Sequence, residues 1–299
     1  MSILSAFPSR VRSRIAEQRP LAPLTTLRVG GNAQFYLEAR GLRDVCDALE
    51  ACRAANMPLH VIGGGSNLLI ADTGVPGLVL NLKQMKGVEV FGQKVLVQAG
   101  AALNTLVATC AGAGIAGPEG LAGIPGSVGG ALAMNAGGRY AEIGRFVDCV
   151  TWITPENRVQ YLYREEIDFQ YRHSSLTRGI VLQAVIGGAT GNAAQLKERA
   201  RCIHAEKLAV QPYSAHSAGC AFKNPKGQSA GKLIDLAGCK GLQVGSARVS
   251  EQHGNFVVNL GGATADDVTG LMSLVKERVR TAHGVELSPE VQIWPRVAA

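Results

Sequence analysis

The sequence lacks several features that would place the protein in common functional classes. Its seven cysteines are scattered and contain no Cys-x-x-Cys pair, and its histidines have no metal-ligand spacing, which argues against a disulfide framework or a zinc site. No apolar run reaches the roughly 18 residues of a membrane span. The N-terminus also has too short an apolar core for a signal peptide. We therefore expect reduced cysteines, a cytoplasmic location, and neither a metal nor a membrane partner.

Charge is moderately one-sided. The 299 residues carry 30 Lys and Arg against 23 Asp and Glu, a formal net charge of +7. No polybasic run or nucleic-acid-binding motif is present, so we expect no nucleic-acid partner. Positive charge is concentrated in residues 206–250. Such a region is typical either of a solvated basic surface or of a pocket for a phosphorylated substrate. The basic residues there are Lys207, Lys223, Lys226, Lys232, Lys240 and Arg248.

Glycine is abundant, with 37 residues, and eight of them fall within residues 117–138. The residues between these glycines are mainly apolar, whereas a flexible linker would be polar. We therefore predict a buried, tightly turned segment that lies against something large. Ser127 and a run of free N–H groups in this segment could bind phosphate oxygens. The alternative is a glycine-rich packing turn between two helices.

A second glycine stretch follows a predicted short buried strand at 59–62. It reads Gly63-Gly64-Gly65-Ser66-Asn67, and its N–H groups and short polar side chains could hold a diphosphate. It differs from the Gly-x-Gly-x-x-Gly of the dinucleotide-binding α/β fold, because no helix follows directly. Two such stretches together favour a dinucleotide ligand.

Hydrophobic periodicity predicts a chain of mixed helices and strands. Pro212 stops a long charged helix and marks a domain boundary. A short helix or arm is predicted at 11–19, and residues 217–225 are predicted as a turn-rich segment. The predicted helices are 42–55, 101–113, 192–209, 229–237 and 264–282. The predicted strands are 33–39, 59–62, 78–82, 88–91, 95–99, 147–154, 159–162, 180–186, 256–260 and an extended segment at 287–293.

Six motifs occur in an order that resembles one enzyme family. They are Thr25-Thr-Leu-Arg-Val-Gly-Gly31, Gly63-Gly-Gly-Ser-Asn-Leu-Leu69, Gly123-Ile-Pro-Gly-Ser-Val-Gly-Gly130 with Met134-Asn-Ala136, Tyr171-Arg172, Ser217-Ala-Gly-Cys-Ala-Phe-Lys-Asn-Pro225 and Pro289-Glu290-Val291. Together they resemble the UDP-N-acetylenolpyruvoylglucosamine reductases, also called UDP-N-acetylmuramate dehydrogenases. The resemblance runs from about residue 24 to residue 293.

This resemblance implies an α+β fold with an FAD-binding domain of the vanillyl-alcohol-oxidase/para-cresol-methylhydroxylase type. It would comprise two subdomains, 1–82 and 83–205, followed by a substrate-binding domain at 206–299. The last strand, about 287–299, is a candidate to return to the first subdomain. Ser66 and Asn67 replace the His or Cys that tethers FAD in some relatives, so non-covalent FAD is expected. The implied cofactor-binding residues are Gly63, Gly64, Gly65, Ser66, Asn67, Ile124, Pro125, Gly126, Ser127, Gly129, Gly130 and Asn135.

The implied activity is NADPH-dependent reduction of UDP-N-acetylglucosamine-enolpyruvate to UDP-N-acetylmuramate, a peptidoglycan precursor, through FAD. Arg172 would bind the enolpyruvyl carboxylate in a bidentate way. Glu290 matches the catalytic glutamate of the family. A monomer is expected.

Cys220 stands where the family usually has serine. A thiol, with a reference pKa of about 8.5, is a stronger acid than a hydroxyl, so we hypothesise that Cys220 donates the proton in the reaction. The alternative is a small core cysteine, with water as the proton source.

Lys223 and Asn224 are predicted to hold the uridine diphosphate or sugar, with Tyr171 and Tyr213 as further substrate contacts. Gln252 or His253 is a further candidate. The interval between Ser175 and Ser214 has no room for the extra tyrosine-bearing loop of one subclass, so the chain resembles the short subclass.

Two other functions fit parts of the same pattern. One is a related FAD-dependent oxidase or dehydrogenase that acts on another small molecule. The other is a non-catalytic nucleotide- or nucleic-acid-binding protein, which would be colourless, whereas a flavoprotein is yellow.

Overall fold

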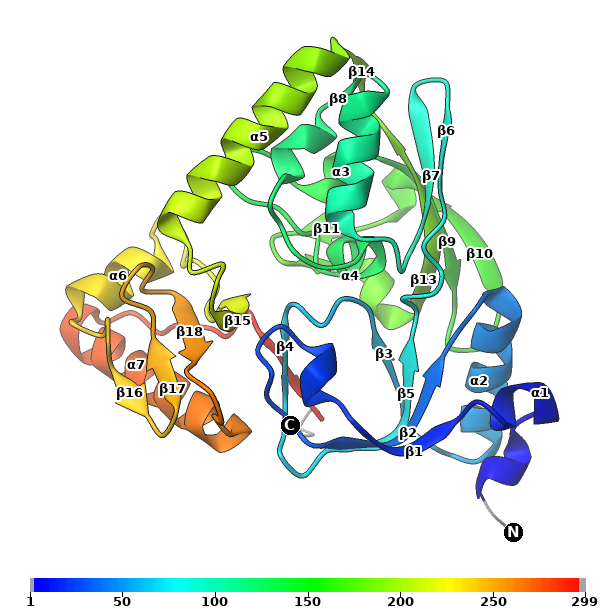
Figure 1. Cartoon of the computed structure of the whole chain (residues 1–299), viewed down its shortest axis with the longest axis horizontal. Helices are drawn as coiled ribbons and strands as arrows, with labels where there is room; N and C mark the ends of the chain where they lie inside the picture. Colours follow the sequence, from blue (N-terminus) through cyan, green and yellow to red (C-terminus); the bar gives the residue numbers. More distant parts are fainter. Residues whose placement is uncertain (1–2, 296–299) are drawn as a thin grey trace. The chain divides into compact units, whose positions relative to one another are not determined.

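The computed structural model describes residues 3–295, which form two compact units (Figure 1). The first unit comprises residues up to 17, 35–64 and 77–207; the second comprises 18–34, 65–76 and 208 onward. These units do not follow the predicted bounds at 82 and 205, and the assignment of two FAD-binding subdomains and a substrate-binding domain stays a prediction. Leu27, Val29 and Leu69 pack into the core of the second unit, which is why two N-terminal segments group with the C-terminal part of the chain.

Most predicted elements are present, with ends displaced by a few residues. The helices are α1 (Ser9–Arg12), α2 (Leu42–Ala54), α3 (Leu103–Gly112), α4 (Val128–Ala133), α5 (Ala193–Val210), α6 (Ala230–Leu236) and α7 (Ala265–His283). The strands up to residue 116 are β1 (Ala16–Pro20), β2 (Asn32–Glu38), β3 (Leu59–Ile62), β4 (Leu68–Ile70), β5 (Val75–Asn81), β6 (Val88–Phe91), β7 (Lys94–Gln98) and β8 (Ile115–Ala116). The later strands are β9 (Val147–Ile153), β10 (Val159–Tyr163), β11 (Phe169–Gln170), β12 (His173–Ser174), β13 (Ile180–Gly187), β14 (Ala189–Thr190), β15 (His216–Cys220), β16 (Gln243–Val244), β17 (Ala247–Val249), β18 (Phe256–Asn259) and β19 (Gln292–Trp294).

The first unit contains a five-stranded sheet in the order β10-β9-β13-β7-β6, against which α3 and α4 pack. Strand β13 lies at its centre and pairs antiparallel with β7 and β9. Strand β7 buries Val95 and Val97 and leaves its alternate residues more accessible, the pattern of a sheet with one covered face. The same core takes in α2, whose Val45, Ala48 and Leu49 recur at helical spacing.

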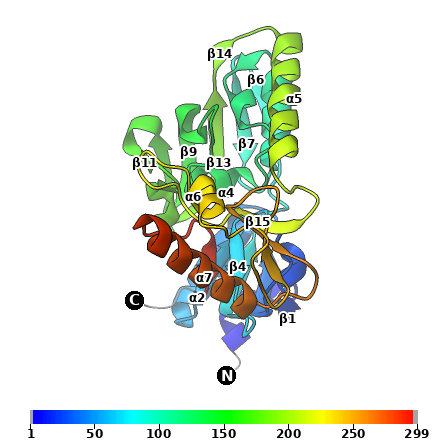
Figure 2. The same cartoon turned by 90° about the vertical axis from the view of Figure 1, so that its left-hand side faces the viewer.

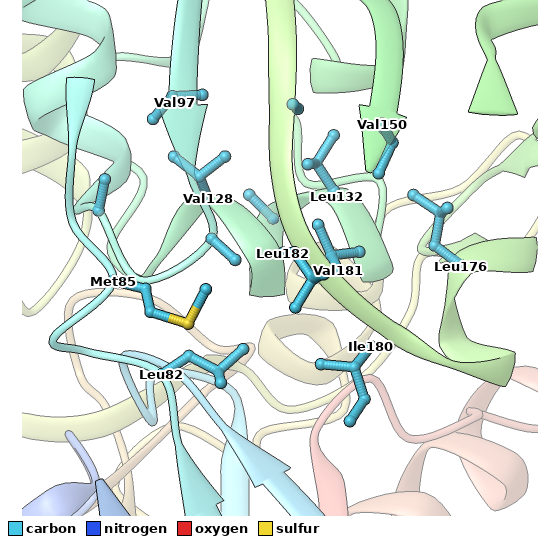
Figure 3. Packing of buried hydrophobic residues seen from close by; sticks show 14 of the residues in the cluster. Leu82, Met85, Val97, Val128, Leu132, Val150, Leu176, Ile180, Val181 and Leu182 are labelled. Carbon is cyan, nitrogen blue, oxygen red and sulfur yellow. The ribbon is translucent and has the colours of Figure 1, made fainter. Parts of the chain in front are cut away.

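Helix α4 joins the glycine-rich segment at 117–138 to this core. Its Val128 and Leu132 are fully buried. Figure 3 shows them among Val97, Val150 and Val181 of the neighbouring strands. The helix begins at Val128 because the side chain of Ser127 caps it. The sequence predicted a tightly turned segment here and missed this helix, since its glycines are poor helix formers.

The second unit has a four-stranded sheet in the order β15-β18-β17-β16. Helix α7 packs against β16 and β17 and against α6 (Figure 2). A capping box between Thr264 and Asp267 starts α7, and Gly284, in the left-handed region at φ 67°, ends it. The final strand β19 pairs in parallel with β4, Gln292 opposite Leu68.

Two predictions of local structure were wrong. Residues 217–225 are not only turns, because strand β15 ends at Cys220. Its register shifts between Ser217 and Cys220, where Gly219 has φ 75°, and this irregularity hides the alternation expected of a strand. Residues 11–19 contain only the end of α1 and then most of β1.

Within residues 3–295, no helix is long and apolar enough to cross a membrane. The same residues contain no cluster of three or more His, Cys, Asp or Glu side chains that could hold a metal ion. All seven cysteines fall in this part of the chain, and none forms a disulfide.

Candidate functional site

The first glycine loop, residues 63–67, joins β3 to β4. A Cβ placed on Gly64 would lie 2.8 Å from Gly126 Cα, and one on Gly63 would collide with Ser127 Oγ. These glycines therefore allow the two glycine stretches to lie directly against each other within the first unit. Gly65 and Leu24 both belong to the second unit. Gly65 has φ 61°, and a side chain there would collide with the backbone of Leu24.

The second glycine loop, residues 123–130, is held by its backbone and by Ser127. Val128 N donates to Ala101 O at 2.9 Å, and Gly129 N donates to Ala99 O at 2.8 Å. Ser127 Oγ accepts from Gly130 N at 3.4 Å. The expected run of free N–H groups is therefore shorter than predicted, because these three amides already have acceptors.

The remaining geometry of the cradle fits a diphosphate. Among the described residues, no acceptor takes the N–H of Gly64, Gly126 or Ser127. These donors belong to segments whose close approach requires glycine, as a phosphate cradle does. The donors carry no formal charge, so they bind phosphate oxygens by direction and dipole. Ile124 is half-buried, whereas Pro125 and Gly130 are exposed on the same loop.

Asn135, a predicted cofactor ligand, has other partners in the structure. It is 2% exposed and has φ 42°. Its Nδ2 donates to Gln170 O at 3.0 Å, and its Oδ1 accepts from Gly144 N at 3.1 Å. The side chain thus fastens neighbouring loops, and a direct contact with the cofactor stays a prediction.

Tyr171 and Arg172 form the two-residue turn between β11 and β12, in which Gln170 pairs with His173. Arg172 adopts φ 55°, a left-handed conformation that is uncommon outside glycine. Its guanidinium carbon lies 4.9 Å from the centre of the Tyr171 ring, a cation–π distance. Tyr171 is exposed and Arg172 half-exposed, so a charged donor stands at the tip of a short hairpin.

In the second unit, the structure brings Cys220 and Glu290 into one small region. Glu290 N donates to Ala221 O at 2.8 Å, and a β-bridge joins Phe222 to Pro289. Asn67, at the end of the first glycine loop, donates from Nδ2 to Glu290 O at 3.2 Å. Cys220 and Glu290 are each partly exposed. The segments that carry Cys220 and Glu290 thus pair through their backbones beside the last residue of the first glycine loop.

The predicted substrate contacts of the second unit have mixed environments. Lys223 is half-buried, and its N–H donates to Ser288 O at 2.8 Å. Asn224 Oδ1 accepts from Ala230 N at 2.9 Å and so caps the start of α6. Tyr213 is partly exposed, and burial of its ring raises the pKa of its hydroxyl.

Gln252 and His253 both have structural partners. Gln252 Nε2 donates to the carbonyls of Leu208 and Ala209, at the end of α5, at 3.3 and 3.1 Å. His253 Nδ1 accepts from Asn255 N at 3.2 Å. Burial is the main cause that lowers the pKa of His253. Substrate contacts by these two residues remain predictions.

Sequence reasoning named Lys207 only as a member of the basic region at 206–250. Its Nζ donates to Ala122 O at 2.5 Å, immediately before the second glycine loop, within the first unit. Burial lowers its pKa to about 8. Its position near the end of a charged helix gave no sign of burial, because a lysine there is ordinarily solvated.

Family comparisons define the class first. A model described as an FAD-binding domain matches residues 33–159, so the chain is an FAD-binding protein. A model described as the C-terminal domain of UDP-N-acetylenolpyruvoylglucosamine reductase matches residues 211–294. Together with the relatives described next, these matches show that the chain belongs to the UDP-N-acetylenolpyruvoylglucosamine reductase family.

Relatives of that name align over nearly their full length. The reductase of Gluconobacter oxydans is 39% identical over 96% of this chain and 95% of its own. That of Synechococcus sp. is 41% identical over 93% and 92%. The crystal structure of the Thermus caldophilus reductase has a TM-score of 0.81 and 39% identity, and it covers 93% of this chain and 98% of its own. The predicted α+β fold, flavin cofactor and family are thereby confirmed.

Proposed function

We propose that the protein reduces UDP-N-acetylglucosamine-enolpyruvate to UDP-N-acetylmuramate at the expense of NADPH, in peptidoglycan precursor synthesis. Identity of 39–41% with reductases of that name, over more than nine-tenths of the chain, supports this substrate. In the reaction a carbon–carbon double bond gains a hydride at its methylene carbon and a proton at the adjacent carbon. NADPH is oxidised to NADP⁺.

FAD, when bound, carries the hydride from NADPH to the substrate. We assign its diphosphate to the cradle of Gly63, Gly64, Gly126 and Ser127, whose close packing and unengaged amides support this assignment. Ser66, rather than His or Cys, follows the three glycines, in keeping with non-covalent binding.

The observation that carries the catalytic assignment is the pairing of the Cys220 segment with the Glu290 segment. Glu290 N donates to Ala221 O, and Asn67 Nδ2 donates to Glu290 O. This backbone pairing, beside the last residue of a glycine loop, supports a shared site for the Cys220 thiol and the Glu290 carboxyl. We assign Cys220 as the proton donor and Glu290 as the acid that polarises the enolpyruvyl carboxylate.

Arg172 would bind the same carboxylate. Addition of hydride pushes negative charge onto that carboxylate, so a fixed cation aimed at it lowers the barrier. The planar guanidinium offers two parallel N–H donors, and the short hairpin limits its freedom. We further propose that Tyr171, Tyr213, Lys223 and Asn224 contact the nucleotide or sugar.

A cytoplasmic, monomeric enzyme is part of this proposal. The support for its location is that none of the seven cysteines, all of which lie within the described residues, is in a disulfide, as expected of a reducing compartment.

The test is a comparison of Cys220→Ser with Cys220→Ala. Substrate-dependent NADPH oxidation is measured in each variant, together with its flavin content. A positioned acid contributes about 10²- to 10⁴-fold, so we expect the alanine variant to lose at least about 100-fold in kcat. The serine variant should retain most of its turnover.

Cys202→Ala is the matched control, because Cys202 is exposed on α5 and should not affect turnover. Full activity of Cys220→Ala would reject the proton-donor role while leaving the substrate assignment intact. Absence of NADPH oxidation by the unsubstituted flavoprotein with this substrate would reject the substrate itself.

A further inference from the structure

The hairpin that presents Arg172 is fastened on both strands. Ser174, in β12, is fully buried, and its Oγ lies 2.8 Å from Leu132 O and 3.0 Å from Ala133 O. These carbonyls close α4, and Leu132 O also accepts from Asn135 N at 3.2 Å, just beyond the helix. The hydroxyl therefore adds a bond at the end of α4 and attaches β12 to it.

The other strand is attached through Asn135, two residues beyond the end of α4. Its Nδ2 donates to the carbonyl of Gln170, which directly precedes Tyr171 and Arg172. Asn135 is buried and left-handed, and its Oδ1 is held by Gly144 N. Both strands of the hairpin are thus joined to the C-terminal end of one helix.

The other end of α4 is the second glycine loop. Ser127 caps the helix, and Val128 and Leu132 bury it in the core. A short rigid element therefore runs from the cradle assigned to the flavin diphosphate to the hairpin that carries Arg172. All of these residues belong to the first unit.

We propose that Ser174 and Asn135 are positioning residues, which fix the guanidinium of Arg172 relative to α4 and the second glycine loop. This inference rests on the proposed function, in which Arg172 binds the substrate carboxylate. The left-handed conformation of Arg172 supports the positioning role, because a strained turn persists only where contacts with the surrounding structure stabilise it. A bidentate contact requires placement within about 0.5 Å, which two freely moving turn residues would not supply.

The primary test is Ser174→Ala, with KM and kcat for the enolpyruvyl substrate, the Kd for FAD and thermal unfolding all measured. Loss of one hydrogen-bonded attachment should raise KM about 10-fold. The Kd for FAD should stay within about twofold, because the glycine loop keeps its own bonds. Thr177→Ala is the matched control, since Thr177 Oγ1 donates within the same segment, to Ser174 O, and does not bond to α4. It should leave KM unchanged.

A double-mutant cycle with Arg172→Ala separates this inference from the proposed function. In the Arg172→Ala background, Ser174→Ala should change KM no further. An Arg172→Ala enzyme with unaltered kinetics would overturn the proposed role of Arg172. An impaired Arg172→Ala enzyme beside a Ser174→Ala enzyme of normal KM would overturn the positioning role, and so would effects that multiply in the double variant.

If Ser174→Ala does not fold, the double-mutant cycle can be repeated with Asn135→Ala, which removes the attachment of the other strand. A raised KM with unchanged FAD affinity would support positioning. A raised Kd for FAD would instead mark Asn135 as a cofactor ligand and overturn its positioning role.

Discussion

The two glycine loops meet within one unit, but they are built differently. The first loop approaches the second through Gly63 and Gly64, where even a Cβ would collide. The second is secured by polar groups, namely the Ser127 cap and the ammonium of Lys207 on Ala122 O. The contact between the loops therefore requires the absence of side chains at Gly63 and Gly64, whereas the second loop also depends on the side chains of Ser127 and Lys207. A side chain added to the first loop and one removed from the second should both weaken the cradle.

Gly64→Ala should have the largest effect. Its Cβ would meet backbone atoms, Gly126 Cα at 2.8 Å and Ser127 N at 3.1 Å, and backbone cannot move aside without displacing the cradle. Overpacking costs about 1–3 kcal/mol, so FAD should bind up to about 100-fold more weakly. Fluorescence titration of the apoprotein with FAD measures this. Tight FAD binding by Gly64→Ala would mean that the diphosphate lies elsewhere.

Gly63→Ala should weaken FAD binding less, about 10-fold, and here a second substitution should help. The main collision is with the side chain of Ser127, whose Oγ is the nearest atom and whose Cβ lies 3.1 Å away. Adding Ser127→Ala removes the Oγ and leaves only the 3.1 Å approach to Cβ, so the double variant should bind FAD only slightly more weakly than Ser127→Ala alone. Gly64→Ala should gain nothing from the same addition. Equal responses of the two glycine variants would contradict the packing described here.

The sequence predicted both loops, because three consecutive glycines, or eight glycines among apolar residues, have few other uses. It also predicted the long elements, such as α5 and α7, from their periodicity. It did not predict α4, because glycines obscure a helix that depends on the Ser127 cap and on burial of Val128 and Leu132. Capping and burial of that kind are tertiary effects.

The roles of the site residues were predicted from the family resemblance. The hydrogen-bond partners of those residues could not be predicted from the sequence. Asn135 lies in a family motif and Gln252 was a candidate substrate contact, yet their amides bond to Gln170 and to the end of α5. The attachment of Ser174 to Leu132, 42 residues apart, leaves no pattern in one sequence. The packing of Leu69 with residues more than 100 positions later could not be predicted for a similar reason.

Lys207→Met should have the smallest effect. If Lys207 anchors the loop, FAD affinity should fall; if it stabilises the whole fold, the unfolding temperature should fall. Loss of the bond to Ala122 O should weaken FAD binding a few-fold, on the order of 1 kcal/mol. The apoprotein should unfold at no lower temperature, because methionine removes a partly buried charge. Lys197→Met, at an exposed position of the same helix, should change neither quantity.

The pH dependence of stability gives a second test of whether the Lys207 ammonium is buried. Burial lowers the pKa of Lys207 from 10.5 to about 8. Below pH 8 both folded and unfolded chains carry the charge, and the fold bears the cost of burying it. Between pH 8 and 10.5 the unfolded chain binds more protons, so this cost is relieved as pH rises. The stability of the wild type should therefore increase over this range relative to Lys207→Met, and a parallel pH profile of the two proteins would contradict a buried ammonium.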